Sequence, residues 1–196
     1  MDKDFLAIFN AIKADGANAD YTKRGIEPLY SVGLALASWS SAGTRRGGGR
    51  DAHPWNDKSG ERLRDWLGVS RETFYDPERV ALLPMDFYFP GHGRSGDLPP
   101  RKGFAEQWHP ALLALMPNVR LTVLVGAYAV RRYLHLKNSD SLTTVVRDYD
   151  AYIGRGFFPL VHPSPRNQLW MSRNPWFEAE TLPALKAQVN AALEQR

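Results

Sequence analysis

Short apolar runs alternate with helical patterns along most of this chain, and that alternation constrains the fold more than any other feature. The runs lie at 34–37, 80–83, 121–125 and 157–161. Between them, apolar residues recur at the spacing of one helix face. Short runs without polar alternation are typical of strands that are buried on both faces of a parallel sheet.

This order of elements predicts an α/β fold, a three-layer α/β/α sandwich with a central, mainly parallel four-stranded sheet. A chain of 196 residues is suited to a single domain, which we expect to span 1–196. Ligands of such sheets bind beyond the carboxyl ends of the strands. A site is therefore expected in the segments that follow the runs, which are 38–50, 84–94, 126–128 and 162–167.

The composition limits the classes of site that the chain can form. Cysteine is absent, which excludes disulfides and thiolate-held zinc or iron–sulfur sites. The five histidines have no paired spacing, so we expect no metal and no other cofactor. No apolar segment approaches the ~20 residues of a membrane helix, and residues 1–4 lack the order of a secretory signal. We therefore expect a cytoplasmic protein without a membrane partner.

The basic residues favour a polyanionic partner. The net charge is +4, and arginines stand on two glycine-rich stretches, where backbone N–H groups can also approach phosphate. One stretch holds Arg45, Arg46 and Arg50, and the other holds Arg94, Arg101 and Lys102. A solvated loop without a ligand remains the alternative.

A stiff turn follows the last apolar run. His162 comes directly after that run, and Pro163 and Pro165 flank Ser164. Prolines restrict the backbone, so the histidine is held at the carboxyl edge of the sheet. Such a residue suits a positioned hydrogen-bond donor, although a surface turn with ordinary polar residues is the alternative.

The sequence at 162–165 resembles the second signature of the uracil-DNA glycosylases. The resemblance implies that His162 donates to the uracil carbonyl oxygen that becomes anionic as the base leaves. It also implies a wedge that fills the gap left by the flipped base, at the position of Arg166, which could stack there or contact phosphate. Ser164 and Asn167 would hold the backbone and lie against the DNA with Arg166.

Further segments resemble one bacterial branch of the same superfamily. They lie at 27–30, 54–57, 59–63, 96–100 and 174–178. The resemblance places Trp55 where relatives carry the aromatic that stacks on the extruded base, which needs a flat apolar surface. A tryptophan that only packs in the core is the alternative.

The first signature departs from the family pattern. Relatives carry Gly-Gln-Asp-Pro or Gly-Gln-Ala-Pro-Gly after the first strand, whereas 39–43 here reads Trp-Ser-Ser-Ala-Gly. Ser41 stands where the best-known branch has the carboxylate that orients the attacking water. The resemblance still predicts base contacts from Ser40, Ala42 and Gly43. Candidates to replace the carboxylate are Asp51, Asp57 and Asp86.

A second departure follows the run at 80–83. Relatives place a base-reading asparagine there, whereas this chain has Met85 and Asp86, with Tyr88 close behind. We expect these three residues to line the base pocket. A carboxylate accepts from N3–H of uracil but repels O4. This predicts looser base selection that extends to other deaminated bases.

The resemblance implies a monofunctional DNA-repair glycosylase that hydrolyses the N-glycosidic bond of uracil in single- or double-stranded DNA and leaves an abasic site. Such a protein is expected to be a nucleoid-associated monomer. No lysine stands in the signatures to form a Schiff base. One alternative is a catalytically weakened protein that binds uracil-containing or abasic DNA. Another is a small-molecule enzyme with a phosphate-binding loop, against which the absence of a Gly-x-Gly-x-x-Gly or Walker sequence counts.

Overall fold

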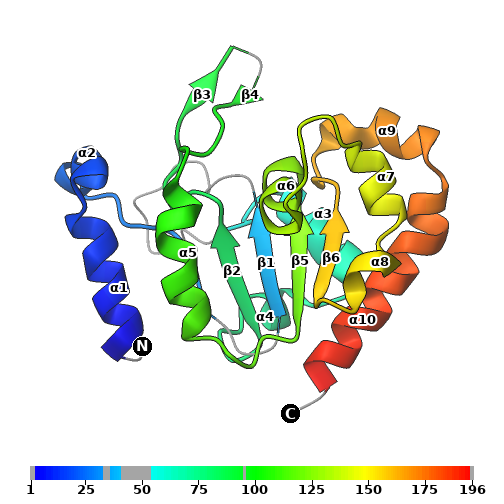
Figure 1. The fold of residues 1–196 in the computed structure, drawn as a ribbon, viewed down its shortest axis with the longest axis horizontal. Coiled ribbons are helices and arrows are strands. Elements are labelled where there is room, and N and C mark those ends of the chain that lie inside the picture. The colour runs from blue at the N-terminus through cyan, green and yellow to red at the C-terminus, as the bar shows by residue number, and fades with distance from the viewer. Residues whose placement is uncertain (1–2, 33–35, 41–53, 95, 195–196) are drawn as a thin grey trace.

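A computed structural model of the protein describes residues 3–32, 36–40, 54–94 and 96–194. Within them, four strands form the central sheet in the order β2-β1-β5-β6, and each neighbouring pair is parallel. Their bounds are β1 Leu36–Ser40, β2 Val80–Pro84, β5 Leu121–Val125 and β6 Phe157–Leu160. The predicted α/β class with a parallel sheet is confirmed (Figure 1).

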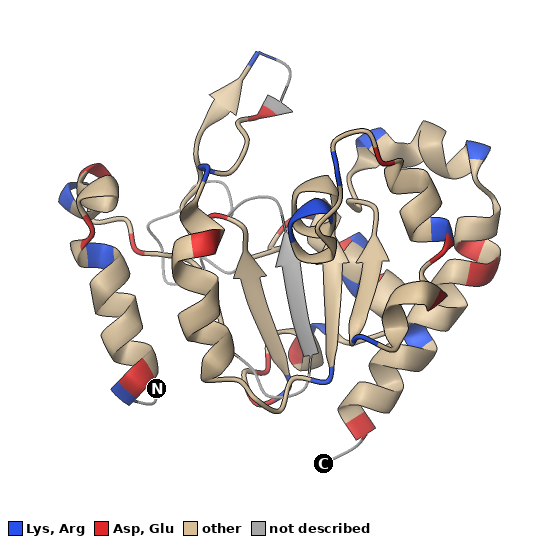
Figure 2. Cartoon of the chain, in the orientation of Figure 1, with Lys and Arg blue, Asp and Glu red and all other residues tan. Residues whose placement is uncertain are grey.

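The strands β2 and β5 are buried along their whole length, as their apolar runs predicted. Along β2, Val80 and Leu82 face one hydrophobic core, and Ala81 and Leu83 face the other. This alternation follows from the two-residue period of a strand. Figure 2 shows β2, β5 and β6 without charged residues.

Helices cover both faces of the sheet and complete three layers (Figure 1). Residues of α3, α4, α9 and α10 join one core, which we call the α3–α10 core, and residues of α1, α5 and α6 join the other, the α5–α6 core. The first group spans α3 Lys58–Leu67, α4 Arg71–Phe74, α9 Gln168–Arg173 and α10 Leu182–Glu194. The second group spans α1 Lys3–Ala14, α5 Phe104–Ala114 and α6 Ala127–Leu134.

Short elements connect these layers. Those before the sheet are η1 Gly16–Asn18 and α2 Ala19–Lys23, and those that follow β5 are α7 Leu142–Arg147, α8 Asp150–Ile153, η2 Pro165–Asn167 and η3 Phe177–Thr181. Val145 and Val146 of α7 reach different cores, so this helix lies along the β6 edge. Among the described helices, none combines the length and apolarity that crossing a membrane requires.

The β3–β4 hairpin has no signal among the apolar runs of the sequence. Residues 89–102 contain no such run, but the structure forms an antiparallel hairpin there, with β3 His92–Gly93 and β4 Gly96–Asp97. A further hydrogen bond joins Leu98 N to Gly91 O over 2.9 Å. Figure 1 shows this hairpin rising beyond the arrowheads of the sheet, on the side where the strands end.

Candidate active site

His162 lies two residues beyond the end of β6, at the carboxyl edge of the sheet. The strand end is secured by a hydrogen bond of 2.8 Å from Gly126 N to Leu160 O. The side chain of Asn167 donates to the His162 carbonyl over 2.7 Å. Ser164 Oγ accepts from the Arg166 N–H over 3.2 Å, so both polar side chains bond to the backbone of this turn.

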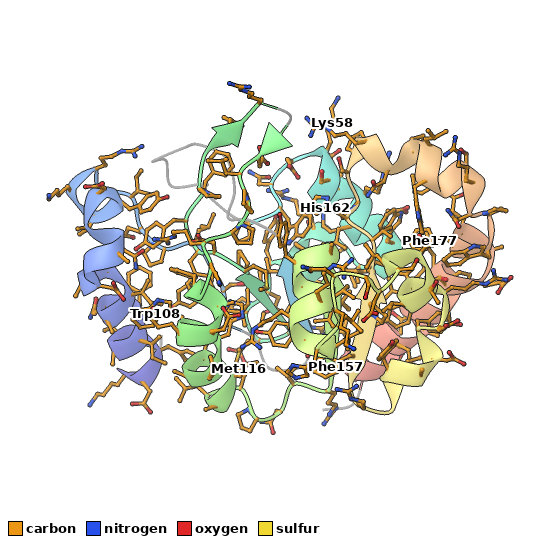
Figure 3. All side chains as sticks on the ribbon, turned by 45° about the horizontal axis from the view of Figure 1, so that its top comes forward. Lys58, Trp108, Met116, Phe157, His162 and Phe177 are labelled. Carbon is orange, nitrogen blue, oxygen red and sulfur yellow. The ribbon has the colours of Figure 1, made fainter. Side chains whose placement is uncertain are left out.

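The His162 ring is electrically neutral at neutral pH. Burial lowers its pKa below the ordinary value of 6.5, and the negative charges of Asp57 and Asp97 oppose that shift. A neutral imidazole carries one N–H, which can donate a hydrogen bond without releasing its proton. Figure 3 labels His162 near the edge that this view turns forward. The ring is therefore a neutral hydrogen-bond donor that feels the charge of two carboxylates.

Trp55 packs directly against His162. The two ring centroids are 5.4 Å apart, and the planes are tilted by 31°. Trp55 is 7% exposed and has a φ of +64°, a left-handed conformation that costs ~1–3 kcal/mol for a non-glycine residue. Strain of this kind persists only where the surroundings hold it. Trp55 belongs to the α3–α10 core, so its surroundings match the core tryptophan that was the alternative, and its ring packs beside His162.

Side chains of α3 and of Tyr75, which follows α4, hold the backbone at Trp55 in that conformation. The buried Arg64 donates through Nη1 to the Trp55 carbonyl over 3.3 Å, and Tyr75 Oη donates to the Pro54 carbonyl over 3.0 Å. A Cβ atom on Gly60 would come within 1.7 Å of the Trp55 carbonyl oxygen. Gly60, which has no Cβ atom, therefore permits α3 to lie close to the Trp55 carbonyl. The sequence carries no local signal for the roles of Arg64 and Tyr75, because both contacts depend on how the helices pack.

The start of α3 also contacts the histidine turn. Asp57 caps the helix, and its Oδ1 accepts the Gly60 N–H over 2.9 Å. Arg62 Nη1 donates to the Ser164 carbonyl over 3.3 Å. One helix end therefore positions Asp57, the Trp55 turn and the His162 turn together.

The structure gives Asp86 a different role from the one that the sequence predicted. Its side chain is completely buried, and its two oxygens accept four hydrogen bonds, from Tyr88 N, Arg101 N, Arg101 Nε and Arg101 Nη2, at 2.8–3.1 Å. A carboxylate offers about four acceptor sites. None is left to orient water or read a base, so we assign Asp86 to structure. Arg101, which the sequence placed with the phosphate-binding residues, is its partner.

The other predicted pocket residues after β2 also lie in packed surroundings. Met85 is 6% exposed, and Tyr88 is 1% exposed, with both in the α5–α6 core. The Tyr88 ring stacks on Tyr21 at a centroid distance of 4.5 Å, and burial raises the pKa of its hydroxyl to about 12. Among the described residues, both side chains therefore pack at the end of β2 and line no open pocket.

A buried histidine fixes the end of β2. His109 Nε2 lies 2.9 Å from the Pro84 carbonyl, and Nδ1 lies 2.6 Å from Tyr133 Oη. A carbonyl only accepts, so Nε2 carries the hydrogen and Nδ1 accepts from the tyrosine. Burial raises the pKa of Tyr133 and lowers that of His109 to about 4, which keeps both groups neutral.

Several predicted residues cannot be compared with the structure. Ser40 ends β1, whereas the following lie outside the described residues: Ser41, Ala42, Gly43, Arg45, Arg46, Arg50 and Asp51. Arg94 is exposed in the hairpin turn, and Arg166 is exposed in η2. Within the described part of the chain, no group of three or more His, Asp or Glu residues is arranged to hold a metal ion.

The family assignment agrees with this geometry. The chain matches the family model of the uracil DNA glycosylase superfamily over residues 39–186. The match begins within β1 and extends into α10, so it includes every strand end that contributes to the site. Because it covers most of the sequence, the protein belongs to the uracil-DNA glycosylase superfamily, whose members generally hydrolyse N-glycosyl bonds in DNA.

Proposed function

We propose that this protein is a monofunctional uracil-DNA glycosylase, which flips uracil out of DNA and hydrolyses its N-glycosidic bond to leave an abasic site. The observation that carries the proposal is the placement of His162 at the carboxyl edge of the sheet, where its backbone carbonyl accepts from Asn167 and its neutral ring packs against Trp55. Family membership supplies the reaction class and DNA as the partner.

His162 stabilises the departing base. When the C1′–N1 bond of deoxyuridine breaks, its electron pair moves onto the uracil, and negative charge develops on the O2 carbonyl oxygen. A donor aimed at that oxygen binds more strongly as the charge grows, which lowers the barrier by about 3 kcal/mol. The neutral imidazole avoids placing a permanent charge in the partly buried site before the reaction.

Trp55 supplies a flat surface for the flipped base. Its proximity to His162 would let one base stack on the indole while its carbonyl oxygen meets the histidine. On the DNA side, Arg94 and Arg166 are exposed on two segments that follow strand ends, where they would contact phosphates.

The proposed substrate range extends to other deaminated bases. Where relatives carry a base-reading asparagine, this chain has Asp86, whose oxygens already bond to Arg101 and Tyr88. The base edge is then read by other groups, with less discrimination. Single-turnover cleavage of oligonucleotides with one uracil, hypoxanthine or xanthine would measure the range. Activity confined to uracil would refute this extension.

Strand scission by alkali tests the main proposal. The purified protein is incubated with single-stranded and duplex oligonucleotides that carry one uracil, and abasic sites are then cleaved. We expect scission with the parent protein, its loss in His162→Ala and partial activity in His162→Gln, which retains a donor. His135→Asn is the matched control, because His135 is exposed at the far end of α6 and asparagine tolerates its φ of +56°.

The same experiment decides against the proposal if His162→Ala keeps the parent rate. Retention of labelled uracil DNA without scission would instead support a binding protein that has lost hydrolysis. Ser41, in place of the usual carboxylate, is the sequence feature that favours this second function. Gel-shift measurements on the same oligonucleotides separate the two functions.

A further inference from the structure

The β3–β4 hairpin carries a histidine–aspartate pair. His92 and Asp97 are directly opposite each other in the antiparallel register, and Asp97 Oδ1 lies 3.1 Å from His92 Nδ1. An ionised carboxylate only accepts, so Nδ1 carries the hydrogen, and Nε2 of the neutral ring is the proton acceptor. The aspartate therefore sets both the tautomer and the direction of the histidine, as in other oriented catalytic histidines.

The surroundings restrict the His92 ring further. The Phe89 ring meets it edge to face, at a centroid distance of 4.9 Å and an angle of 66°. Gly93 pairs with Gly96, and Leu98 N bonds to Gly91 O, so the hairpin is paired on both sides of the histidine–aspartate pair. The His92 side chain is still 57% exposed, which leaves it accessible to water and to DNA.

The hairpin brings this pair to the same edge of the sheet as His162. It follows β2, whose carboxyl end lies at that edge, and Figure 1 shows it extending beyond the strands. The charge of Asp97 acts on the His162 ring, which places the pair within electrostatic reach of the leaving-group site.

We propose that His92, oriented by Asp97, is the general base that activates water for glycosidic hydrolysis; this inference rests on the proposed function. The water oxygen forms a bond to C1′ of the sugar while the C1′–N1 bond breaks. One water proton passes to His92 Nε2, and the electron pair of the broken bond leaves with the base, beside His162. The protonated His92 then returns the proton through solvent to the free base.

The other carboxylates near the site are less suited to this step. Ser41 replaces the carboxylate of the first signature, and Asp86 is saturated by its bonds to Arg101 and Tyr88. Asp57 already uses one oxygen to cap α3, because its Oδ1 accepts the Gly60 N–H. An imidazole is the side chain best matched to accepting a proton near neutral pH.

Single-turnover excision with saturating uracil DNA tests the role of His92. We expect His92→Ala to lower the rate by about a hundredfold or more, the usual contribution of a general base. Added imidazole should restore much of that rate, because it replaces the missing proton acceptor. His162→Ala should gain nothing from imidazole, since the neutral donor role is not a proton transfer. Leu98→Ala, next to the pair on the same hairpin, is the matched control and should keep the parent rate.

Asp97 is a positioning residue, and its variants provide a second measurement. Asp97→Asn should slow excision because the amide no longer selects the Nδ1–H tautomer, and Asp97→Glu should recover part of the loss. A His92→Ala rate close to that of the parent would overturn the inference and leave the proposed function intact. A loss that imidazole does not relieve and that matches a loss of DNA affinity would also overturn it. Absence of excision by the parent protein on every base would overturn both.

Discussion

The side-chain amide of Asn167 donates a hydrogen bond of 2.7 Å to the backbone carbonyl of His162. The bond spans the turn that begins where β6 ends, and η2 brings the amide back toward the strand. It fixes the direction in which the chain leaves the sheet. The position of the His162 ring therefore depends on Asn167, whose side chain bonds to the His162 backbone.

Asn167→Ala should slow excision about tenfold or less, because one lost hydrogen bond is worth ~1 kcal/mol and its loss here frees the turn. Single-turnover rates measure the effect, and thermal melting should show only a small change. Ser172→Ala is the control, since Ser172 Oγ also donates to a backbone carbonyl, that of Leu169, over 2.9 Å. Equal rate losses in both variants would contradict a specific role for Asn167.

Gly60→Ala should displace Trp55. The new Cβ would lie 1.7 Å from the Trp55 carbonyl oxygen, and backbone cannot move away as a flexible side chain does. Overpacking of this kind costs ~1–3 kcal/mol, and we expect excision to fall with it. A Cβ atom on Gly154 would meet nothing within 4 Å. Gly154→Ala should therefore change neither the stability measured by urea unfolding nor the excision rate. An active, stable Gly60→Ala protein would show that the position of Trp55 is not critical.

Arg101→Met should destabilise the fold by ~3–5 kcal/mol, because it leaves the completely buried Asp86 carboxylate without its charged partner. The double variant Asp86→Leu/Arg101→Met should be more stable than Arg101→Met alone, since the unpaired charge is gone. Urea unfolding at constant pH measures both.

Asp86→Asn tests the assignment of this residue to structure. Stability should fall, but the folded protein should excise uracil at a rate within a few-fold of the parent. Complete loss of excision in a folded Asp86→Asn protein would return Asp86 to the chemistry.

His109 should make stability depend on pH. Burial lowers its pKa to about 4, whereas the unfolded residue titrates near 6.5. The unfolded state therefore binds the proton first as pH falls below about 6.5, and the fold loses stability until His109 protonates near pH 4. The loss from this residue is about 2 kcal/mol between pH 7 and pH 5. His109→Gln should show a smaller loss over that interval in urea unfolding, and an equal loss would contradict the assignment.

Arg166→Ala should weaken DNA binding in a salt-dependent way. If the exposed guanidinium neutralises one phosphate, the slope of log K against log salt falls in magnitude by about 0.9. Fluorescence anisotropy at several salt concentrations measures it. Arg166→Leu, which introduces an apolar wedge, should excise uracil from duplex DNA faster than Arg166→Ala. Its salt slope should stay as small as that of Arg166→Ala. An unchanged slope in both variants would exclude the phosphate contact.

Local sequence patterns determined the order of the main elements. The run 121–125 coincides with β5, and Gly126 is followed by α6, as expected from an apolar run and a helix-compatible segment. The predicted run at 34–37 is shifted relative to β1, whose described bounds extend to Ser40. Strand ends depend on pairing with neighbours, and Ser40 is included because it is in register with Pro84. Propensity within the strand does not contain that information.

The sequence by itself determined the α/β class, the stiff turn at His162 and the departure of the first signature, because each depends on residues adjacent in the chain. Only the tertiary structure decided the partners of Asp86, the contact of Trp55 with His162, and the approach of the hairpin to the site. Asp86 and Arg101 are 15 positions apart in the sequence. Trp55 precedes α3, whereas His162 follows β6. Whether a buried carboxylate meets water, a base or an arginine depends on the packing around it, and no local pattern specifies that outcome.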